Sequence, residues 1–198
     1  MLKAVLFDLD GTLVRYGADY AHFVSLMAAG WGIEEAGDRF FEFYRSAVLA
    51  EGPVSLASSV EFALRSTGRS MPDEFSVRCL EAVEGYAGGI ELLPGALELL
   101  AAYEHLPRAI VSNGPSDMQR AAIRSAGIEG LFETVVISGD VDVAVRKPNP
   151  EIFLIACRRL GVLPGEVLMI GDNEEADLAG AAVAGIPGVH VSDALLTL

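Results

Sequence analysis

Five short apolar segments constrain the fold of this sequence more than any other feature. Each is four or five residues long, nearly continuous in hydrophobicity and rich in β-branched residues, which is typical of strands buried on both faces of a sheet. They cover residues 3–7, 108–111, 134–137, 167–170 and 188–191. Segments with helical spacing lie between the last four, at residues 117–126, 150–160 and 176–184. This alternation predicts an α/β fold built on a doubly wound, Rossmann-like parallel sheet.

The long interval between the first two apolar segments has a different character. Residues 14–92 lack a convincing strand, and helical periodicity recurs at residues 19–29, 36–48, 54–65 and 73–86. The chain returns through the turn Leu93-Pro94-Gly95 into an expected helix at residues 96–103. We therefore expect residues 1–13 and 93–198 to form the α/β core and residues 14–92 to form an inserted helical cap. An insertion of this kind is a natural lid over a binding site.

The acidic composition excludes one class of partner. Acidic residues outnumber basic residues 28 to 14, and the resulting net charge of −14 repels the phosphate backbone of DNA or RNA. If this protein handles a smaller phosphate, a metal ion, a lysine or oriented amides must supply positive charge locally. The apolar runs are too short for a signal sequence or a membrane span, and Cys79 and Cys157 are too few for a disulfide framework. We expect a cytoplasmic protein with buried thiols, and its oligomeric state stays open.

Carboxylates follow two of the predicted strands. Asp8 and Asp10 come directly after the first strand, and Asp172 follows the fourth. Because parallel strands end at the same edge of a sheet, these side chains can share one crevice. A hard cation such as Mg²⁺ or a shared proton would relieve their repulsion, and a shared proton would make Asp10 a candidate general acid. The alternative is an ordinary acidic turn at Gly11, and the spacing of Asp8 and Asp10 alone does not decide between the two.

Phosphate-binding groups are expected after the second and third strands. Ser112 and Asn113 end the second strand, where a hydroxyl and main-chain amides can meet an anion, although either residue could instead cap a turn. Lys147 is one of only two lysines and precedes a helix that begins at Pro150. Its ammonium group suits an isolated phosphoryl oxygen, and the alternative is a solvated surface lysine.

These motifs, taken in order, resemble those of the haloacid dehalogenase-like hydrolase superfamily, in its helical-cap phosphatase branch. The residues that carry the resemblance are Asp8-Leu9-Asp10-Gly11-Thr12, Ser112-Asn113, Lys147-Pro148, and Gly171-Asp172 with Asp177 beyond. The resemblance implies a magnesium-dependent phosphatase that hydrolyses a small phosphorylated metabolite through an aspartyl-phosphate intermediate. Nucleoside monophosphates, phosphoglycolate and sugar phosphates are the substrates that it suggests.

The resemblance also implies a role for each residue. Asp8 would be the nucleophile, and Asp10 would protonate the leaving oxygen and later deprotonate a water molecule. Substrate phosphate would be held by Ser112, Asn113 and Lys147. The expected Mg²⁺ ligands are Asp8, the main-chain carbonyl of Asp10, Asp172 and Asp177, the last directly or through water.

Two departures from the family pattern leave questions open. The run from Asp142 to Arg146 is longer than usual, so Arg146 could share the role of Lys147. The cap begins with Val14-Arg15-Tyr16 in place of an acidic pair, so its substrate contacts are unfamiliar. The cap side chains that could meet a substrate are Arg15, Tyr16, Tyr20, His22, Arg39 and Arg45.

Other functions are compatible with parts of the pattern. Asp10 argues against a dehalogenase, since a leaving halide needs no proton. A phosphomutase would keep every core residue and stays an alternative. A phospho-aspartate signalling domain also uses Mg²⁺ and a lysine, but it resembles neither the helical insertion nor the place of Asp8 after the first strand. An inactive binding protein would be expected to have lost some of these residues.

Overall fold

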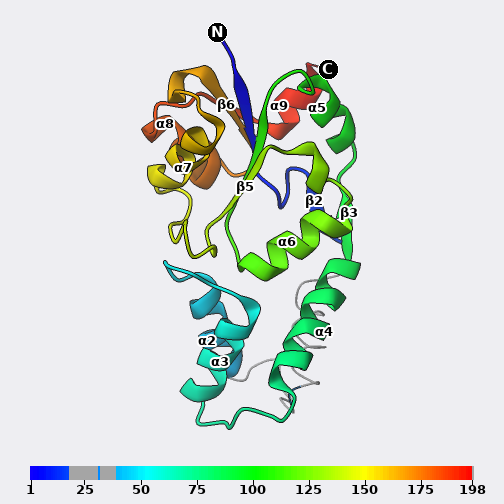
Figure 1. The fold of residues 1–198 in the computed structure, drawn as a ribbon, viewed down its shortest axis with the longest axis vertical. Helices are drawn as coiled ribbons and strands as arrows, with labels where there is room; N and C mark the ends of the chain where they lie inside the picture. Colours follow the sequence, from blue (N-terminus) through cyan, green and yellow to red (C-terminus); the bar gives the residue numbers. More distant parts are fainter. Residues whose placement is uncertain (18–30, 32–38, 198) are drawn as a thin grey trace.

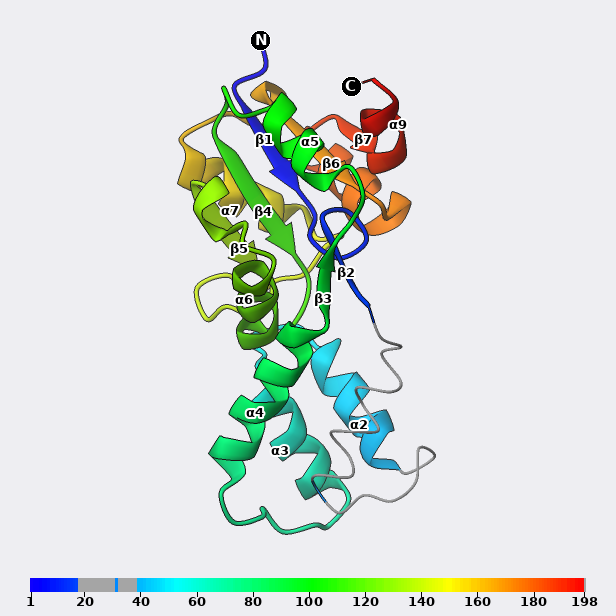
Figure 2. The ribbon, with the colours of Figure 1, turned by 90° about the vertical axis from the view of Figure 1, so that its right-hand side faces the viewer.

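A five-stranded parallel sheet lies at the centre of the structure, which is a computed structural model describing residues 1–17, 31 and 39–197. Its strands are β1 (Ala4–Phe7), β4 (Arg108–Ser112), β5 (Thr134–Ile137), β6 (Val167–Gly171) and β7 (Gly188–His190). They are arranged in the order β5-β4-β1-β6-β7 (Figures 1 and 2). The predicted doubly wound α/β fold is confirmed, and all five strands lie where the apolar segments place them.

Both faces of the central strand β1 are buried, which explains why it is apolar at every position. Along β1, Val5 and Phe7 belong to one hydrophobic cluster, while Ala4 and Leu6 belong to a second. The first cluster includes residues of α5 (Ala96–Ala102), α6 (Ser116–Ser125) and α9 (Val191–Leu196). The second includes residues of α7 (Pro150–Leu160) and α8 (Gly180–Val183). Alternate residues of each strand therefore face different helix layers, as a doubly wound sheet requires.

The helix boundaries follow local chemistry. At the start of α7, the Asn149 side chain accepts a hydrogen bond from the main-chain amide of Glu151 at 3.0 Å, and Gly161 ends the helix with a φ of 69°. The helix predicted at residues 176–184 begins earlier, as the π-helix η3 (Glu174–Ala179), and continues into α8. Asn173 caps this earlier start by accepting from the amides of Glu175 and Ala176. Short 3₁₀ turns, η1 (Glu129–Leu131) and η2 (Pro164–Glu166), complete the core.

A group of helices lies beyond the carboxyl ends of the central strands. It contains α2 (Arg39–Val48), α3 (Leu56–Ser66) and α4 (Phe75–Gly88), and in Figure 2 the arrowheads of β1 and β4 point toward it. These match three of the predicted cap helices, whereas the helix predicted at residues 19–29 lies outside the described residues. Cys79 and Cys157 are buried free thiols, as expected. Within the described ranges, no helix is long and apolar enough to cross a membrane.

A two-stranded antiparallel ribbon connects these helices to the core. Strand β2 (Val14–Tyr16) pairs with β3 (Ile90–Leu92), and Val14 lies opposite Leu92. The expectation that residues 14–92 lack strands is therefore wrong at both ends of the interval. Strands of three residues are too short to show an alternating pattern in the sequence. The ribbon lets the chain leave the core and return to it at nearly the same point.

The loop between α2 and α3 is joined to the core through main-chain hydrogen bonds. The amide of Val54 donates to the carbonyl of Gly139 at 3.0 Å, and the amide of Ser116 donates to the carbonyl of Val54 at 2.8 Å. The carboxylate of Asp117 accepts from the amide of Leu56, which begins α3, at 2.9 Å. We call this set of hydrogen bonds, formed by Val54, Leu56, Ser116, Asp117 and Gly139, the seam. It places the loop beside the start of α6, close to the end of β4.

Replacing Gly139 with alanine is expected to disrupt this seam. A Cβ atom there would lie 2.4 Å from the carbonyl oxygen of Val54 and 2.5 Å from that of Gly114, and main-chain atoms cannot rotate away. We expect Gly139→Ala to lower the free energy of unfolding by about 1–3 kcal/mol, measured by urea denaturation. Gly165→Ala is the matched control, because nothing lies within 4 Å of the added atom. Equal stability of the two variants would contradict the importance of the seam.

Candidate active site

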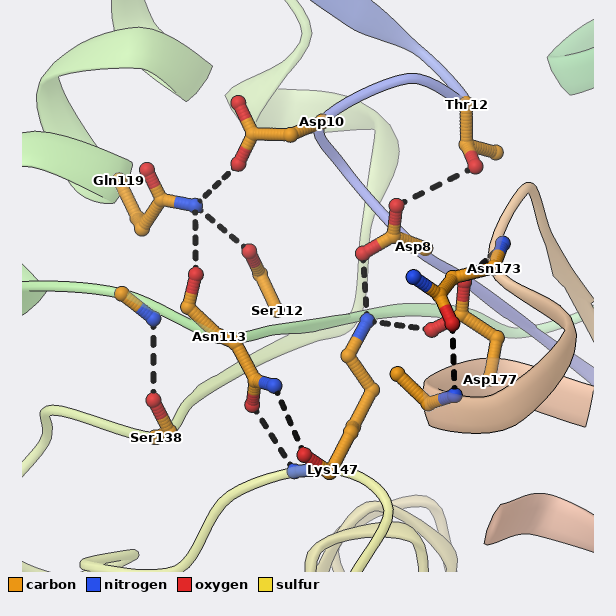
Figure 3. Close-up of polar contacts among 12 residues, drawn as sticks. Asp8, Asp10, Thr12, Ser112, Asn113, Gln119, Ser138, Lys147, Asn173 and Asp177 are labelled. Carbon is orange, nitrogen blue, oxygen red and sulfur yellow. Dashed lines mark hydrogen bonds and ion pairs between the residues drawn. The ribbon is translucent and has the colours of Figure 1, made fainter. Parts of the chain in front are cut away.

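The ends of three neighbouring strands form the candidate site. Strand β1 pairs with β4 on one side and β6 on the other, so the strand order reverses at β1. Ligands of open α/β sheets bind at such a reversal, beyond the carboxyl ends of the strands. Asp8 follows β1, Ser112 ends β4, and Asp172 follows β6. The residues predicted from the strand ends therefore meet at one place, where Asp172 lies close to Asp8, and Figure 3 shows Asp8 and Ser112 there.

Lys147 links two buried carboxylates at the centre of the site. Its ammonium nitrogen lies 2.5 Å from Oδ1 of Asp8 and 2.6 Å from Oδ1 of Asp177, and all three side chains are at most 8% exposed. Burial raises the pKa of Asp8 to about 7, against the opposing effect of Lys147, and the Asp177 carboxylate adds to the rise. Burial alone would lower the pKa of Lys147, but the two carboxylates outweigh it and raise that pKa. One ammonium group thus faces two carboxylates, and the site keeps an excess of negative charge.

A second feature of the site is a cluster of carboxylate oxygens that fits a divalent cation. Asp8, Asp172 and Asp177 each offer one oxygen, and these oxygens lie within 4.8 Å of one another. Hard oxygen donors in this number suit Mg²⁺. A Cβ atom at Gly11 would lie 2.3 Å from Oδ2 of Asp172, so glycine makes room for that carboxylate. The residues present therefore fit a Mg²⁺ ion.

The carboxylate of Asp10 does not join this cluster but faces α6. The side-chain amide nitrogen of Gln119 lies 2.5 Å from Oδ2 of Asp10, 2.7 Å from Oγ of Ser112 and 3.2 Å from the carbonyl oxygen of Asn113 (Figure 3). Desolvation by the surrounding protein raises the pKa of Asp10, although part of its surface meets solvent, and the hydrogen bond from Gln119 opposes the rise. The expected metal contact of Asp10 is its main-chain carbonyl, and this contact stays a prediction.

Asn113 holds the loop that carries Lys147. Its side-chain oxygen accepts from the main-chain amide of Lys147 at 2.9 Å, and its side-chain nitrogen donates to the carbonyl of Lys147 at 3.0 Å. Both ends of the Asn113 amide are therefore engaged by one residue. This pair of bonds fixes the backbone from which the ammonium group reaches Asp8. A contact between Asn113 and substrate phosphate stays a prediction, and it would have to come from the main chain.

Comparison with known proteins shows the family of this chain. The model of a family described as haloacid dehalogenase-like hydrolase matches residues 2–185. The chain belongs to the haloacid dehalogenase-like hydrolase family. It is 31% identical to a phosphoglycolate phosphatase of Yersinia pestis over 198 residues, which cover 96% of this chain and 81% of the relative.

Solved structures of the family share the fold of this haloacid dehalogenase-like hydrolase. A HAD phosphatase from Thermococcus onnurineus has 27% identity and a TM-score of 0.69, over 96% of this chain and 86% of that one. The L-2-haloacid dehalogenase from Xanthobacter autotrophicus, with chloropropionic acid covalently bound, has 28% identity and a TM-score of 0.63. That match covers 95% of this chain and 76% of the dehalogenase. The predicted family and fold are both confirmed.

The structure separates the two basic residues that the sequence left as alternatives. Lys147 enters the site, whereas the guanidinium group of Arg146 donates to the carbonyl of Val48, at the end of α2, at 2.8 Å. Burial lowers the pKa of Arg146. A cation at the carboxyl end of a helix is stabilised by the helix dipole. Arg146 therefore connects the core to α2 and does not share the position of Lys147.

Two of the cap side chains considered as substrate contacts lie on the ribbon. Arg15 on β2 pairs with Glu91 on β3 at 3.1 Å, and both are exposed. The ring of Tyr16 stacks on that of Tyr86, with centroids 5.4 Å apart. Each thus has a structural partner where the chain enters the cap, and any contact with substrate stays a prediction.

The other four candidates lie at or before α2. Arg39 places its guanidinium group over the ring of Phe43, 5.4 Å from the centroid, and Arg45 is exposed. Tyr20 and His22 lie outside the described residues. Any contact of Arg39 or Arg45 with substrate stays a prediction.

Three residues near the site were not assigned a role from the sequence. Gln119 is the most central of them, and a single amide in the otherwise apolar buried face of α6 is the signal that could have revealed it. The Thr12 hydroxyl donates to Oδ2 of Asp8 at 3.2 Å. Nδ1 of His190 accepts from the amide of Ser192, which leaves the proton on Nε2 to donate to the carbonyl of Asp172 at 3.0 Å.

Proposed function

We propose that this protein is a Mg²⁺-dependent phosphatase that hydrolyses a small phosphomonoester through an aspartyl-phosphate on Asp8. The observation that carries the proposal is the placement of Asp8, which is buried against the Lys147 ammonium group and shares a carboxylate cluster with Asp172 and Asp177. A nucleophilic carboxylate in this position has both an ammonium group and a cation-binding cluster beside it. Both are needed before an anionic phosphate can approach a second anion.

The relatives favour the phosphatase branch of the family. Phosphoglycolate phosphatases match nearly the whole chain, and a phosphoserine phosphatase of Thermus thermophilus is 40% identical over 90 residues, which cover 46% of this chain. The protein is accordingly an enzyme that hydrolyses phosphoric monoesters. We infer a small phosphorylated metabolite as the substrate, with 2-phosphoglycolate the first compound to test. Residues 14–92 would form the cap that selects it.

In the first half-reaction, a carboxylate oxygen of Asp8 attacks phosphorus, and the bond between phosphorus and the ester oxygen breaks. Asp10 gives its proton to that departing oxygen, so an alcohol leaves and Asp8 carries the phosphoryl group. The ammonium group of Lys147 stabilises the charge that builds around the reacting carboxylate. The Ser112 hydroxyl would donate to a phosphoryl oxygen, since its oxygen accepts from Gln119 and its O–H group can then act as a donor.

In the second half-reaction, Asp10 takes a proton from a water molecule, whose oxygen attacks phosphorus. The bond between phosphorus and Asp8 then breaks and releases inorganic phosphate and the free carboxylate. Bound Mg²⁺ would neutralise phosphoryl oxygens throughout. It would be held by Asp8, the main-chain carbonyl of Asp10, Asp172 and Asp177.

Asp10 is the feature that favours ester hydrolysis over dehalogenation. A halide leaves as a stable anion, whereas an alkoxide needs a proton as its bond to phosphorus breaks. Asp10 follows the nucleophile by two residues, and a hydrogen bond from Gln119 fixes its carboxylate. The site is therefore equipped for a leaving group that must be protonated.

Metal removal provides the direct test of this function. Purified protein should hydrolyse 4-nitrophenyl phosphate with Mg²⁺, and excess EDTA should lower the rate at least about 100-fold, because the acidic cluster then repels the substrate. Added Mg²⁺ in excess of the chelator should restore the rate. Full turnover in EDTA would contradict the proposal. A panel of phosphorylated metabolites, compared by kcat/KM, would then identify the substrate.

A further inference from the structure

The amide of Gln119 occupies a special place beside the proposed acid. Gln119 lies near the start of α6, is 3% exposed, and directs its side-chain nitrogen at Asp10, Ser112 and the Asn113 carbonyl (Figure 3). We propose that Gln119 is a positioning residue that holds the carboxyl group of Asp10 for proton transfer to the leaving group. The inference rests on the proposed function and adds a residue to which nothing in the family pattern described above gives a role.

The partners of Gln119 determine how its amide is oriented. The main-chain carbonyl of Asn113 can only accept a hydrogen bond, and an ionised Asp10 carboxylate also only accepts. The nitrogen of the amide, and not its oxygen, must therefore face them. The amide has two N–H groups but three acceptors, whose oxygens lie 2.5, 2.7 and 3.2 Å from its nitrogen. One N–H group is therefore shared between two acceptors, and the longest contact is one of this pair.

The surroundings of Gln119 hold the side chain in this position. Gly114 has a φ of 150°, and a Cβ atom there would lie only 3.0 Å from Cδ of Gln119. The absence of a side chain at Gly114 therefore leaves room for the Gln119 amide beside its backbone. The first turn of α6 and the residue after Gln119 are also held by Asp140, since Arg120 donates to Asp140 at 2.7 Å and Ser116 binds the same carboxylate. The amide is thus preorganised by the start of the helix and is not a mobile surface group.

Asp10 needs such a partner because the residue is exposed and little else in the described part of the chain holds its carboxyl group. Part of its side chain meets solvent, and among the described residues Gln119 provides the only side-chain hydrogen bond to its carboxyl group. The bond is made to Oδ2, which leaves Oδ1 free to carry the proton that goes to the leaving oxygen. An acid displaced by about 1 Å can cost about 100-fold in rate.

The bond also gains strength during the reaction. As Asp10 gives up its proton, negative charge builds on its carboxyl group, and a hydrogen bond from a neutral amide to a carboxylate is stronger than one to a carboxylic acid. The interaction with Gln119 is therefore greater in the transition state than in the ground state. An interaction of that kind affects kcat more than substrate binding.

The test compares two leaving groups in the same protein. Gln119→Met keeps the length of the side chain but removes both donors. For phenyl phosphate, whose leaving group benefits from a proton, we expect kcat/KM to fall about 10- to 100-fold. For 2,4-dinitrophenyl phosphate, which needs no proton, we expect a loss under about 3-fold. The ratio of the two losses does not depend on how much of the variant is folded, because both substrates are measured on one preparation.

Two further variants make the result specific to Asp10. Met118→Leu, at the neighbouring buried position of α6, should change both substrates equally and only slightly. In an Asp10→Asn background, Gln119→Met should no longer change the discrimination between the substrates, since the acid through which it acts is gone. Equal losses for both leaving groups in an active protein would overturn this inference alone. A wild type that hydrolyses neither ester would overturn the proposed function and this inference together.

Discussion

Asp8→Asn is expected to abolish hydrolysis of 4-nitrophenyl phosphate, with kcat falling at least about 10⁴-fold in saturating Mg²⁺. The substitution keeps the shape of the side chain but replaces the oxygen that attacks phosphorus with part of a neutral amide. Two neighbouring carboxylates are already engaged, since Asp10 is held by Gln119 and Asp177 lies against Lys147. Measured turnover above this limit would contradict Asp8 as the nucleophile.

The same substitution is expected to change how stability depends on pH in the absence of metal. The pKa of Asp8 rises from 3.8 to about 7 because of burial, so the folded state binds a proton that the unfolded state releases. A raised pKa stabilises the folded state below pH 3.8, and this contribution is lost as the pH rises through about 7. The loss is on the order of a few kcal/mol. The free energy of unfolding of Asp8→Asn should therefore decline less than that of the wild type between pH 5 and 8, measured by urea denaturation in EDTA.

A matched control separates these effects from a general loss of charge. Asp142→Asn removes one carboxylate from a side chain that is 75% exposed and pairs with Arg159 outside the site. We expect it to retain wild-type turnover and nearly wild-type stability, since exposed ion pairs contribute little. A similar loss of activity in both variants would point to net charge and not to nucleophilic chemistry.

The sequence predicted the sheet well because burial on both faces leaves a strong local signal. All four residues of β1 are fully buried, and each strand of the central sheet reads as a nearly continuous apolar run. The ribbon of β2 and β3 has no such signal, because its strands are three residues long and only partly buried. The π-helix η3 also gives no distinct spacing, so the sequence could predict a helix there but not its form.

The candidate site was predictable in its members but not in its contacts. Asp8, Ser112 and Asp172 follow from their place at strand ends, since parallel strands bring their carboxyl ends together. The contact between Lys147 and Asp8 joins residues 139 apart in sequence and depends on the order of the strands. The engagement of Asn113 with the Lys147 backbone likewise needs two loops to meet. A buried amide such as Gln119 becomes meaningful only once its helix is placed beside Asp10.

Lys147→Met is expected to impair both catalysis and folding, because it removes the one cation that the structure shows between Asp8 and Asp177 in the described part of the chain. We expect kcat/KM to fall about 10²- to 10³-fold, since charge on the reacting groups loses its stabilising partner. We also expect the free energy of unfolding to fall by about 3–5 kcal/mol near neutral pH, the usual cost of leaving buried charges without a partner. Urea denaturation and steady-state kinetics measure the two effects separately.

The direction of the pH dependence distinguishes this loss from simple mispacking of the methionine. Without the ammonium group, the opposing influence on the pKa of Asp8 disappears, so the Asp8 carboxyl group takes up a proton more readily in the folded state. A raised pKa favours the folded state at acid pH, and the deficit of Lys147→Met relative to wild type should therefore shrink toward pH 5 and grow toward pH 8. Arg146→Met is the neighbouring control, because its partner is the Val48 carbonyl and not a carboxylate of the site. A deficit that is constant with pH, or an equal loss of turnover in Arg146→Met, would contradict the role of Lys147, because its ammonium group must matter most to Asp8 when that carboxyl group is ionised.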